Sequence, residues 1–269
     1  MNLKKDLAPL WLNIPSDTKS RLLHCLDSAV AEKQKKGGSV VFFRADDVGV
    51  PGPGFFKLIS LFREHRIPLT MGVVPAWLTK TRWQVIVEEC GRDHSLWCWI
   101  QHGWRHINHE CRGKKMEFGP SRPFAHKRTD LKLGLQRLKY LMGDALVPAF
   151  APPWNRCDEE TLIAVREFGY AGLSRSVSAE PPAPAGIPEY GVTVDLHTRK
   201  EKIAEEGWQS LFKELRKSLA NGFCGIMAHH QRMNDPAFAF LDLLLRLLKQ
   251  NHHIQVVHLR TLIKEHGKR

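Results

Sequence analysis

Apolar residues along the chain follow two patterns: short continuous runs, and longer segments in which they recur every three or four residues. Short β-branched and aromatic runs are typical of buried parallel strands, whereas the longer spacing is typical of amphipathic helices. The runs predict strands at residues 40–43, 69–74, 96–101, 146–150, 172–174, 191–196, 223–228 and 254–257. The spaced segments predict helices at residues 16–36, within 51–66, at 82–90, 130–142, 159–168, 206–219, 236–249 and after 257.

Two segments have neither pattern and are predicted to be loops. Residues 111–128 are rich in Gly, Pro and charge, and residues 178–188 are rich in Pro and Ala without a change of composition afterwards. Strand and helix otherwise alternate about seven times, which predicts a parallel sheet covered by helices, and a barrel rather than an open sheet. We expect one domain over residues 1–269, with residues 1–38 as an N-terminal helical extension.

Composition narrows the class of protein. A chain of 269 residues with 43% apolar content can bury a large core. The N-terminus has no apolar run of signal-peptide length and no segment is long enough to span a bilayer, so we expect a cytoplasmic protein without a membrane partner. Six cysteines occur singly, without CxxC spacing, which favours free thiols over structural disulfides.

The formal net charge of +12 favours anionic partners through long-range attraction. The basic residues are scattered, however, and no nucleic-acid recognition motif accompanies them. We therefore expect most of them to form a solvated surface, and we rank nucleic-acid binding last among the functions considered.

Two adjacent carboxylates, Asp46 and Asp47, follow the predicted strand at residues 40–43 after two intervening residues. Two buried carboxylates repel each other unless a cation or an arginine compensates them, so the pair indicates either a metal site or an Asp-rich turn that caps the next helix. His102 and His106 follow another predicted strand and are four residues apart, which would put both imidazoles on one face of a helical turn. Two imidazoles and one carboxylate form a three-ligand set that leaves positions open for water and substrate.

Polar residues follow other predicted strands as well. In a barrel the carboxyl ends of the strands meet at one rim, where catalytic residues lie. We therefore expect one shared site from the residues after five strands, namely Asp46, Asp47, His102, His106, His109, Trp154, Asn155, Arg156, Asp195, His197, His229 and His230.

The segments ADDVG, HGWRH, APPWNR and GIMAHH resemble the successive motifs of the polysaccharide deacetylase superfamily, also called NodB-homology or carbohydrate esterase family 4, in its divergent, uncharacterised bacterial branch. The resemblance spans residues 39–258 and is strongest in the first two motifs. It implies a distorted (β/α)7 barrel, NodB-like in fold, with a divalent metal, usually zinc, held by one Asp and two His. It also implies hydrolysis of acetamides on amino sugars.

Carried onto this sequence, the resemblance implies that Asp47, His102 and His106 are the metal ligands and that Asp46 is the general base. It implies that His229 is the general acid, although His230 beside it is an alternative. Asp195 corresponds to the acid that orients this histidine.

The third motif departs from the family pattern, because the usual Arg before the proline is absent. Arg156, after the proline pair, or Arg44 could instead pair with the base. Trp104, Trp154, Asn155 and His230 are expected to bind substrate.

Some polar and aromatic residues have simpler interpretations. Trp97 and Trp99 alternate in a predicted strand and are expected in the core. Glu117 and His109 are expected to be exposed.

These patterns predict a metal-dependent deacetylase or amide hydrolase that removes an acyl group, such as acetyl, from a small N-acylated, amino-sugar-like molecule. The alternative is a catalytically silent barrel that binds a glycan or other anionic ligand. The sequence predicts neither the oligomeric state nor the identity of the substrate.

Overall fold

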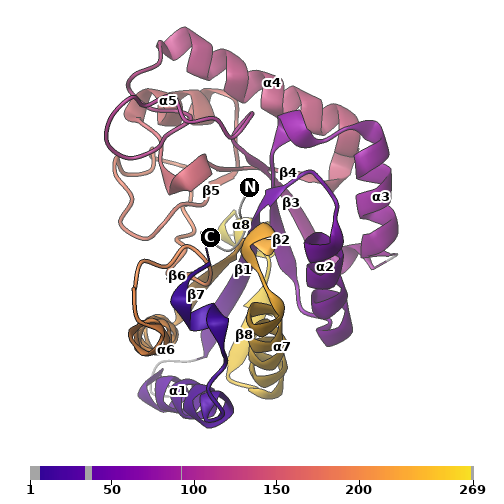
Figure 1. Cartoon of the computed structure of the whole chain (residues 1–269). Helices are drawn as coiled ribbons and strands as arrows, with labels where there is room; N and C mark the ends of the chain where they lie inside the picture. Colours follow the sequence, from indigo (N-terminus) through magenta and orange to yellow (C-terminus); the bar gives the residue numbers. More distant parts are fainter. Residues whose placement is uncertain (1–6, 34–37, 92, 268–269) are drawn as a thin grey trace. The chain divides into compact units, whose positions relative to one another are not determined.

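The structure, a computed structural model, describes residues 7–33, 38–91 and 93–267 (Figure 1). Its strands are β1 (Ser39–Val48), β2 (Leu69–Val73), β3 (Trp97–His102), β4 (Leu146–Ala151), β5 (Gly172–Leu173), β6 (Val194–Asp195), β7 (Phe223–Ala228) and β8 (Ile254–Val257). Its helices are α1 (Thr18–Lys33), α2 (Pro53–His65), α3 (Lys80–Cys90), α4 (Phe124–Met142), α5 (Glu159–Glu167), α6 (Ala204–Ala220), α7 (Asp235–Gln250) and α8 (Leu259–His266).

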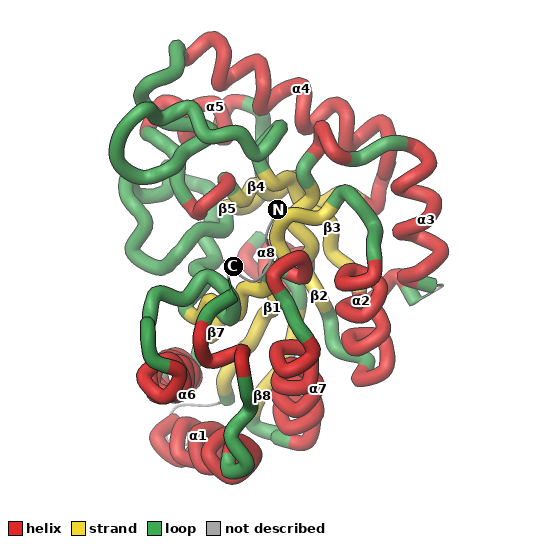
Figure 2. The backbone as a smooth tube through the Cα atoms, viewed as in Figure 1, coloured by secondary structure: helices red, strands yellow, loops and turns green. Residues whose placement is uncertain are grey.

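Helices and strands alternate along most of the chain, as the apolar pattern predicted (Figure 2). The residues form two compact units. The first unit contains the described residues of 1–45, 52–69 and 193–258, and the second those of 46–51, 70–192 and 259–269. Strand β1 runs from the first unit into the second. Among the described residues, no helix is both long and apolar enough to cross a membrane.

In the first unit, β1 pairs with β7 on one side and β8 on the other, and β6 pairs with β7. All these pairs are parallel, as predicted, and Val40 lies opposite Phe223 in the register. The apolar start of β1 is buried on both faces, which suits a central parallel strand. Helix α1 packs along α6, and α2 packs against α7 (Figure 1).

The core of the first unit includes an aromatic cluster. Trp11, from the short 3-10 turn η2 (Pro9–Leu12), lies 5.4 Å from Trp208 of α6 and 5.3 Å from Phe240 of α7, measured between ring centroids. The Trp11 indole N–H also donates to the carbonyl of Leu196, 2.7 Å away. This N-terminal turn therefore fixes the chain directly after β6.

In the second unit, the strands follow the order β1, β2, β3, β4 and β5, with the last residues of β1 at one edge. The pairs β3–β4 and β4–β5 are parallel. Trp97 and Trp99 on β3 are 2% and 5% exposed, which confirms their predicted place in the core. Helix α4 packs against α5 and α3.

The predicted loop at residues 111–128 ends earlier, because α4 already begins at Phe124. The added first turn has no apolar periodicity, and its inward side chain is Lys127, which is 1% exposed. The Lys127 ammonium is compensated by Asp158 and by Glu160, the latter at 2.7 Å. The first turn of α4 is therefore buried through ion pairs between Lys127 and acidic residues about thirty positions later in the chain. The local sequence around Lys127 does not indicate such a contact.

The predicted strand at residues 191–196 is also shorter, since only Val194–Asp195 are assigned to β6. The segment changes partner along its length. Val192 forms an isolated parallel bridge with Ser176 in the second unit, whereas the Thr193 amide donates to Gly225 of β7 in the first. A run that divides its backbone hydrogen bonds between two partners cannot form one continuous strand.

Candidate functional site

The two adjacent aspartates at the end of β1 have different backbone conformations. Asp46 is 2% exposed, and a Cβ atom on the facing residue Gly72 of β2 would lie 2.9 Å from its Oδ1 atom. Asp47 has a φ of 62° in the left-handed region, which Asp tolerates better than most residues. Glycine at position 49 lets the chain pass close to Trp77, since a Cβ there would lie 2.9 Å from the Trp77 Cβ. The left-handed φ of Asp47 therefore gives the two neighbouring carboxylates different positions in one site.

His102, the last residue of β3, is held in a fixed tautomer. Its Nδ1 atom lies 2.9 Å from the carbonyl oxygen of Ala151 on β4, and the side chain is buried. A carbonyl oxygen only accepts hydrogen bonds, so Nδ1 carries a proton and Nε2 is the nitrogen that can bind a metal. That Nε2 atom lies 3.4 Å from Oδ1 of Asp47.

His106 reaches the same aspartate, but not from a helical turn as predicted. Residues 103–106 form an irregular loop, in which Gly103 has a φ of 64° and His106 a φ of 59°. The His106 Nε2 atom lies 3.0 Å from Oδ1 of Asp47. A spacing of four residues therefore brings the two imidazoles together through a tight loop, and the helical interpretation was wrong.

Glu117 organises this loop and is buried, contrary to the prediction that it is exposed. Its side chain is 1% exposed, and its carboxylate accepts hydrogen bonds from the backbone N–H groups of Trp104, Arg105 and His106. Burial raises the pKa of Glu117, and the hydrogen bonds from Arg105 and Trp104 oppose that shift. His109 in the same segment is half-buried.

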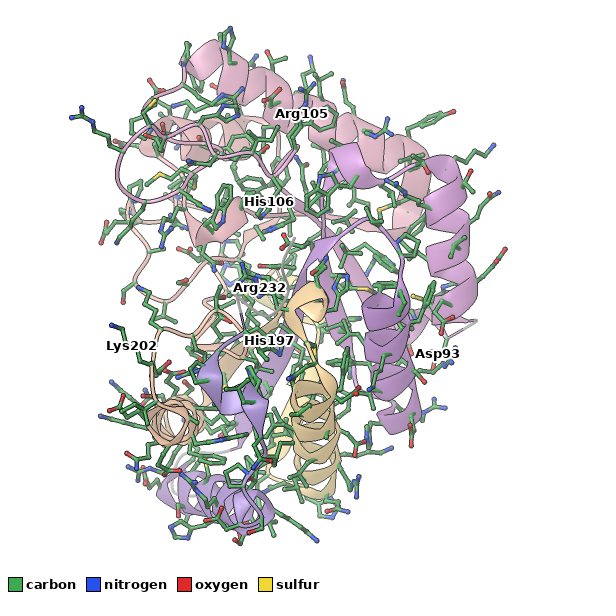
Figure 3. All side chains as sticks on the ribbon, in the orientation of Figure 1. Asp93, Arg105, His106, His197, Lys202 and Arg232 are labelled. Atoms are coloured by element: carbon green, nitrogen blue, oxygen red, sulfur yellow. The ribbon has the colours of Figure 1, made fainter. Side chains whose placement is uncertain are left out.

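Two indole rings flank His106. The ring centroid of Trp154 lies 4.5 Å from that of His106, and the centroid of Trp77 lies 5.7 Å from it. Trp154 and Asn155 lie in the 3-10 turn η7 (Pro153–Asn155) with φ values of 57° and 59°. Trp154 is half-buried and Asn155 is 9% exposed. Trp104 is half-buried too, with the guanidinium of Arg105 5.9 Å from its ring centroid. Figure 3 labels Arg105 and His106 of this segment.

The donor set fits a divalent metal such as zinc. One ligand atom each from Asp47, His102 and His106 can be chosen so that all three lie within 4.8 Å of one another. Burial lowers the pKa of His106 to about 4, assisted by the charge of His102, although Asp47 and Asp46 act in the opposite direction. His106 is thus neutral at neutral pH and can offer a lone pair. Two imidazoles and one carboxylate are typical ligands of catalytic zinc.

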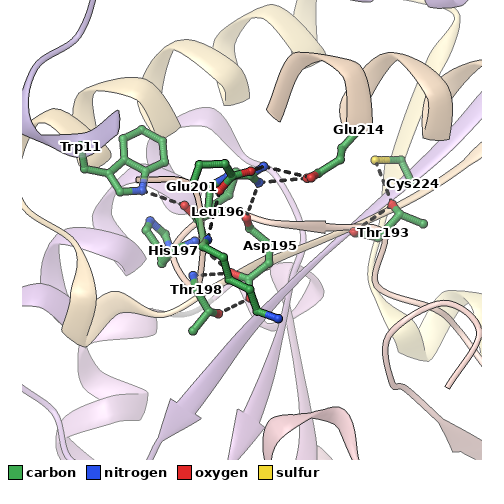
Figure 4. Close-up of polar contacts among 12 residues, drawn as sticks. Trp11, Thr193, Asp195, Leu196, His197, Thr198, Glu201, Glu214 and Cys224 are labelled. Carbon is green, nitrogen blue, oxygen red and sulfur yellow. Dashed lines mark hydrogen bonds and ion pairs between the residues drawn. The ribbon is translucent and has the colours of Figure 1, made fainter. Parts of the chain in front are cut away.

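The first unit contains a second polar cluster, centred on Asp195 at the end of β6 (Figure 4). The Asp195 carboxylate accepts hydrogen bonds from the backbone N–H groups of His197 and Thr198, both at 2.9 Å, and from the Thr198 hydroxyl. Burial alone would raise the pKa of Asp195, but the charge of His229 and these hydrogen bonds outweigh it and lower the pKa. Asp195 is therefore a carboxylate close to His229, and its role in orienting that histidine stays a prediction.

His197 links this carboxylate to His229, a role that the sequence did not reveal. The backbone N–H of His229 donates to Nδ1 of His197 at 3.0 Å. Burial lowers the pKa of His197 to about 3, assisted by the charge of His229, so the ring is neutral. The signal available in the sequence was the spacing of His197 two residues after Asp195, beyond the end of a strand.

The remaining predicted residues have varied surroundings. Nη1 of Arg156 lies 3.5 Å from the Lys115 carbonyl oxygen, and the side chain is half-buried. Arg44 is fully buried, with Nη2 3.1 Å from the Met227 sulfur. His230 is 3% exposed, and its ring packs edge-on against Phe55. The roles of Arg156 and Arg44 beside the base, and of His230, Trp104, Trp154 and Asn155 in substrate binding, stay predictions.

No family model and no curated protein matches the sequence, but solved structures match the fold. A Mycobacterium smegmatis protein assigned to the polysaccharide deacetylases matches with a TM-score of 0.63 and 15% identity over 86% of this chain and 91% of its own. Puue allantoinase matches with a TM-score of 0.62 and 15% identity over 85% and 90% of the two chains. A family 4 acetyl xylan esterase from Clostridium thermocellum, in complex with a cobalt ion, matches with a TM-score of 0.51 and 14% identity over 85% and 92%.

At these levels of identity a structural likeness establishes the fold and leaves the reaction to be argued from the site. The parallel strands with their covering helices agree with it in both units. The chain therefore has the NodB-like fold of polysaccharide deacetylases and family 4 carbohydrate esterases, a distorted (β/α)7 barrel.

Proposed function

We propose that the protein is a metal-dependent hydrolase that removes an acyl group, most simply acetyl, from an N-acylated, amino-sugar-like small molecule. The observation that carries the proposal is the convergence of Asp47, His102 and His106 in a chain with the deacetylase fold. The cobalt ion in the structurally similar acetyl xylan esterase supports a divalent metal, and we propose zinc for this chain because the donors are two imidazoles and one carboxylate.

The three ligands would hold the metal, which when bound would polarise the scissile carbonyl and lower the pKa of a nearby water. His102 is oriented for this role by the Ala151 carbonyl, and His106 by its loop. Protein hydrogen bonds thus fix the positions of both histidines. We expect tight binding for that reason.

Asp46 is proposed as the general base. Its side chain is buried next to the metal ligands of the second unit, and its charge acts on His106. A carboxylate in that position can take the proton from an attacking water. It does not occupy the place of a ligand, because the cluster of donor atoms uses Asp47.

His229 is proposed as the proton donor to the departing amine. The Asp195 carboxylate is held by the backbone N–H groups of His197 and Thr198, and the neutral His197 ring accepts the backbone N–H of His229. Histidine is the side chain that most often transfers a proton in enzyme catalysis. The cytoplasmic location and the soluble substrate stay predictions of the sequence.

The proposal is tested by metal analysis and by an assay for acetate release. Protein purified with zinc or cobalt is expected to hold about one metal per chain and to release acetate from a panel of N-acetylated amino sugars and their small derivatives. His106→Ala is expected to lose both properties. His109→Ala is the matched control, because His109 lies in the same segment but outside the cluster of ligand atoms.

The two outcomes that contradict the proposal differ in meaning. Full activity of metal-free protein or of His106→Ala would exclude metal dependence. A protein that binds metal and an N-acetylated sugar, measured by calorimetry, but releases no acetate from any member of the panel would instead be the silent binding barrel.

A further inference from the structure

The inference concerns Glu117, a buried carboxylate in the segment between β3 and α4. Its Oε1 atom lies 2.6 Å from the Arg105 amide nitrogen and 3.0 Å from that of His106, and its Oε2 atom lies 3.1 Å from that of Trp104. Successive backbone N–H groups that point to one side form a concave binding site for an anion. In this chain the anion is a side chain of the protein itself.

We propose that Glu117 is a positioning residue whose carboxylate holds residues 104–106 in the turn that presents the His106 imidazole to the metal. The inference rests on the metal site of the proposed function. It assigns a task to a residue that is not a ligand and that the chemistry of hydrolysis does not use.

The backbone of the turn requires an external support. His106 has a φ of 59°, a left-handed conformation that is uncommon outside Gly although His adopts it more often than most residues, and Gly103 has a φ of 64°. A left-handed histidine persists only where its surroundings determine it. The bond from the His106 amide to Glu117 acts directly on the strained residue.

Glycine at position 103 is matched to the carboxylate. A Cβ atom at this position would lie 2.1 Å from Oε2 of Glu117 and 2.5 Å from Cγ of Pro153. Any larger residue would push the carboxylate away from the turn. The HGWRH segment and Glu117 therefore form one structural unit, although Glu117 is eleven residues beyond His106.

Glu117 is itself fixed to the second unit. Its backbone carbonyl accepts a hydrogen bond from Arg122 at 3.2 Å, and Arg122 is paired with Asp130 of α4 at 2.7 Å. The next residue, Phe118, is fully buried with its ring 5.6 Å from that of Phe150 on β4. The Glu117 carboxylate is thus fixed in position and can hold the loop of residues 103–106.

The test uses Glu117→Gln, which preserves shape but replaces one acceptor oxygen with an NH2 donor. Either orientation of the amide leaves at least one of the three N–H groups facing a donor. Loss of support around a metal ligand typically lowers metal affinity by about 10–100-fold. We expect that weakening for Zn²⁺ in a chelator competition, together with a changed visible spectrum of the Co²⁺ form.

The matched control is Glu110→Gln in the same segment. The Glu110 carboxylate accepts hydrogen bonds from Ser121 and contacts no ligand residue through them. This variant is expected to keep the affinity and the spectrum of the unsubstituted protein. Glu117→Asp, which retains the charge on a shorter stem, is expected to restore part of the affinity that Glu117→Gln loses.

If Glu117→Gln does not fold, Gly103→Ala tests the same contact from the opposite side and is expected to weaken metal binding similarly. A Glu117→Gln protein, or in its place Gly103→Ala, with unchanged Zn²⁺ affinity and Co²⁺ spectrum overturns the inference alone. An unsubstituted protein that binds neither metal overturns the proposed function and this inference together. Slower amide exchange at residues 104–106 in the metal-free protein than in the variant supports the inference independently of loading.

Discussion

Asp46 and Asp47 show how neighbouring residues of one type acquire different tasks. Asp47 adopts a left-handed φ of 62° and approaches both histidines, whereas Asp46 keeps its place on β1 against Gly72 of β2. The side chains differ in burial as well, since Asp46 is 2% exposed and Asp47 is half-buried. Geometry, rather than chemistry, distinguishes the proposed base from the proposed ligand.

Asp46→Asn separates these roles. The substitution keeps the shape of the side chain but cannot take up a proton, so we expect kcat for acetate release to fall by about 10²–10⁴-fold. Metal content is expected to stay at the level of the unsubstituted protein, because Asp46 is not one of the three clustered donors. Elemental analysis alongside kinetics checks both. Retained activity would exclude Asp46 as the base, and lost metal would make it a ligand.

At the scale of elements, the ends of strands supply the candidate chemistry and the loops after them determine its geometry. His102 is held by strand pairing, because the register of β3 and β4 places it opposite Ala151. His106 and His197 depend instead on loops that hydrogen bonds from distant residues or neighbouring strands stabilise. In the loop of His106, the helical turn that the four-residue spacing predicted was wrong.

The loop after β6 carries a prediction about pH. His197 keeps its neutral form until the pH reaches about 3 in the folded protein, whereas an unfolded histidine has a pKa of about 6.5. The unfolded chain therefore binds more protons across this window. Stability from this residue is present above pH 6.5 and is lost as the pH falls toward 3, by at most about 1.4 kcal/mol per pH unit.

His197→Asn tests this, because asparagine does not titrate and its side-chain oxygen can still accept the His229 N–H. We expect the free energy of unfolding in urea to fall less steeply between pH 7 and about pH 4.5 in the variant. His106 has a lowered pKa of about 4 and contributes with the same sign in both proteins, so the difference isolates His197. If the free energy of unfolding falls equally with pH in both proteins, the His197 ring is not buried in its neutral form.

At the scale of the whole molecule, all six cysteines are free and only one is exposed. Cys111 lies at the surface, whereas Cys25, Cys90, Cys98, Cys157 and Cys224 are buried. Burial raises the pKa of Cys157 and Cys224 to about 12, and that of Cys25 and Cys98 to about 11. These groups stay as thiols, which react poorly, because the thiolate is the nucleophile.

A thiol titration is therefore expected to show one rapidly reacting group in the native protein and six in denaturant. Cys111→Ser should remove the rapid phase and leave five groups that react only after unfolding. If more than one thiol reacts rapidly in the native protein, at least one of the five buried cysteines is accessible to the reagent. Fewer than six in denaturant without reductant would reveal a disulfide.

The sequence alone determined the elements whose pattern is local. Strands β7 and β8 have the bounds that their apolar runs predicted, and the alternation of strands and helices gave the parallel arrangement. It also indicated that Asp46, Asp47, His102 and His106 lie at one edge, because parallel strands bring residues that follow them together. The family resemblance implied that Asp47 is the aspartate of the cluster with His102 and His106. The spacing of apolar residues is a property of neighbouring residues, and a one-dimensional pattern records it.

The tertiary structure decided what depends on contacts between distant residues. Glu117 binds the loop that carries His106, and His197 accepts the backbone N–H of His229. Lys127 is buried in the first turn of α4 and pairs with Glu160. Each of these polar groups is buried because a partner far along the chain satisfies it. The residues next to it in the sequence do not indicate that partner. A polar residue is therefore predicted to be exposed unless the tertiary structure shows what it binds.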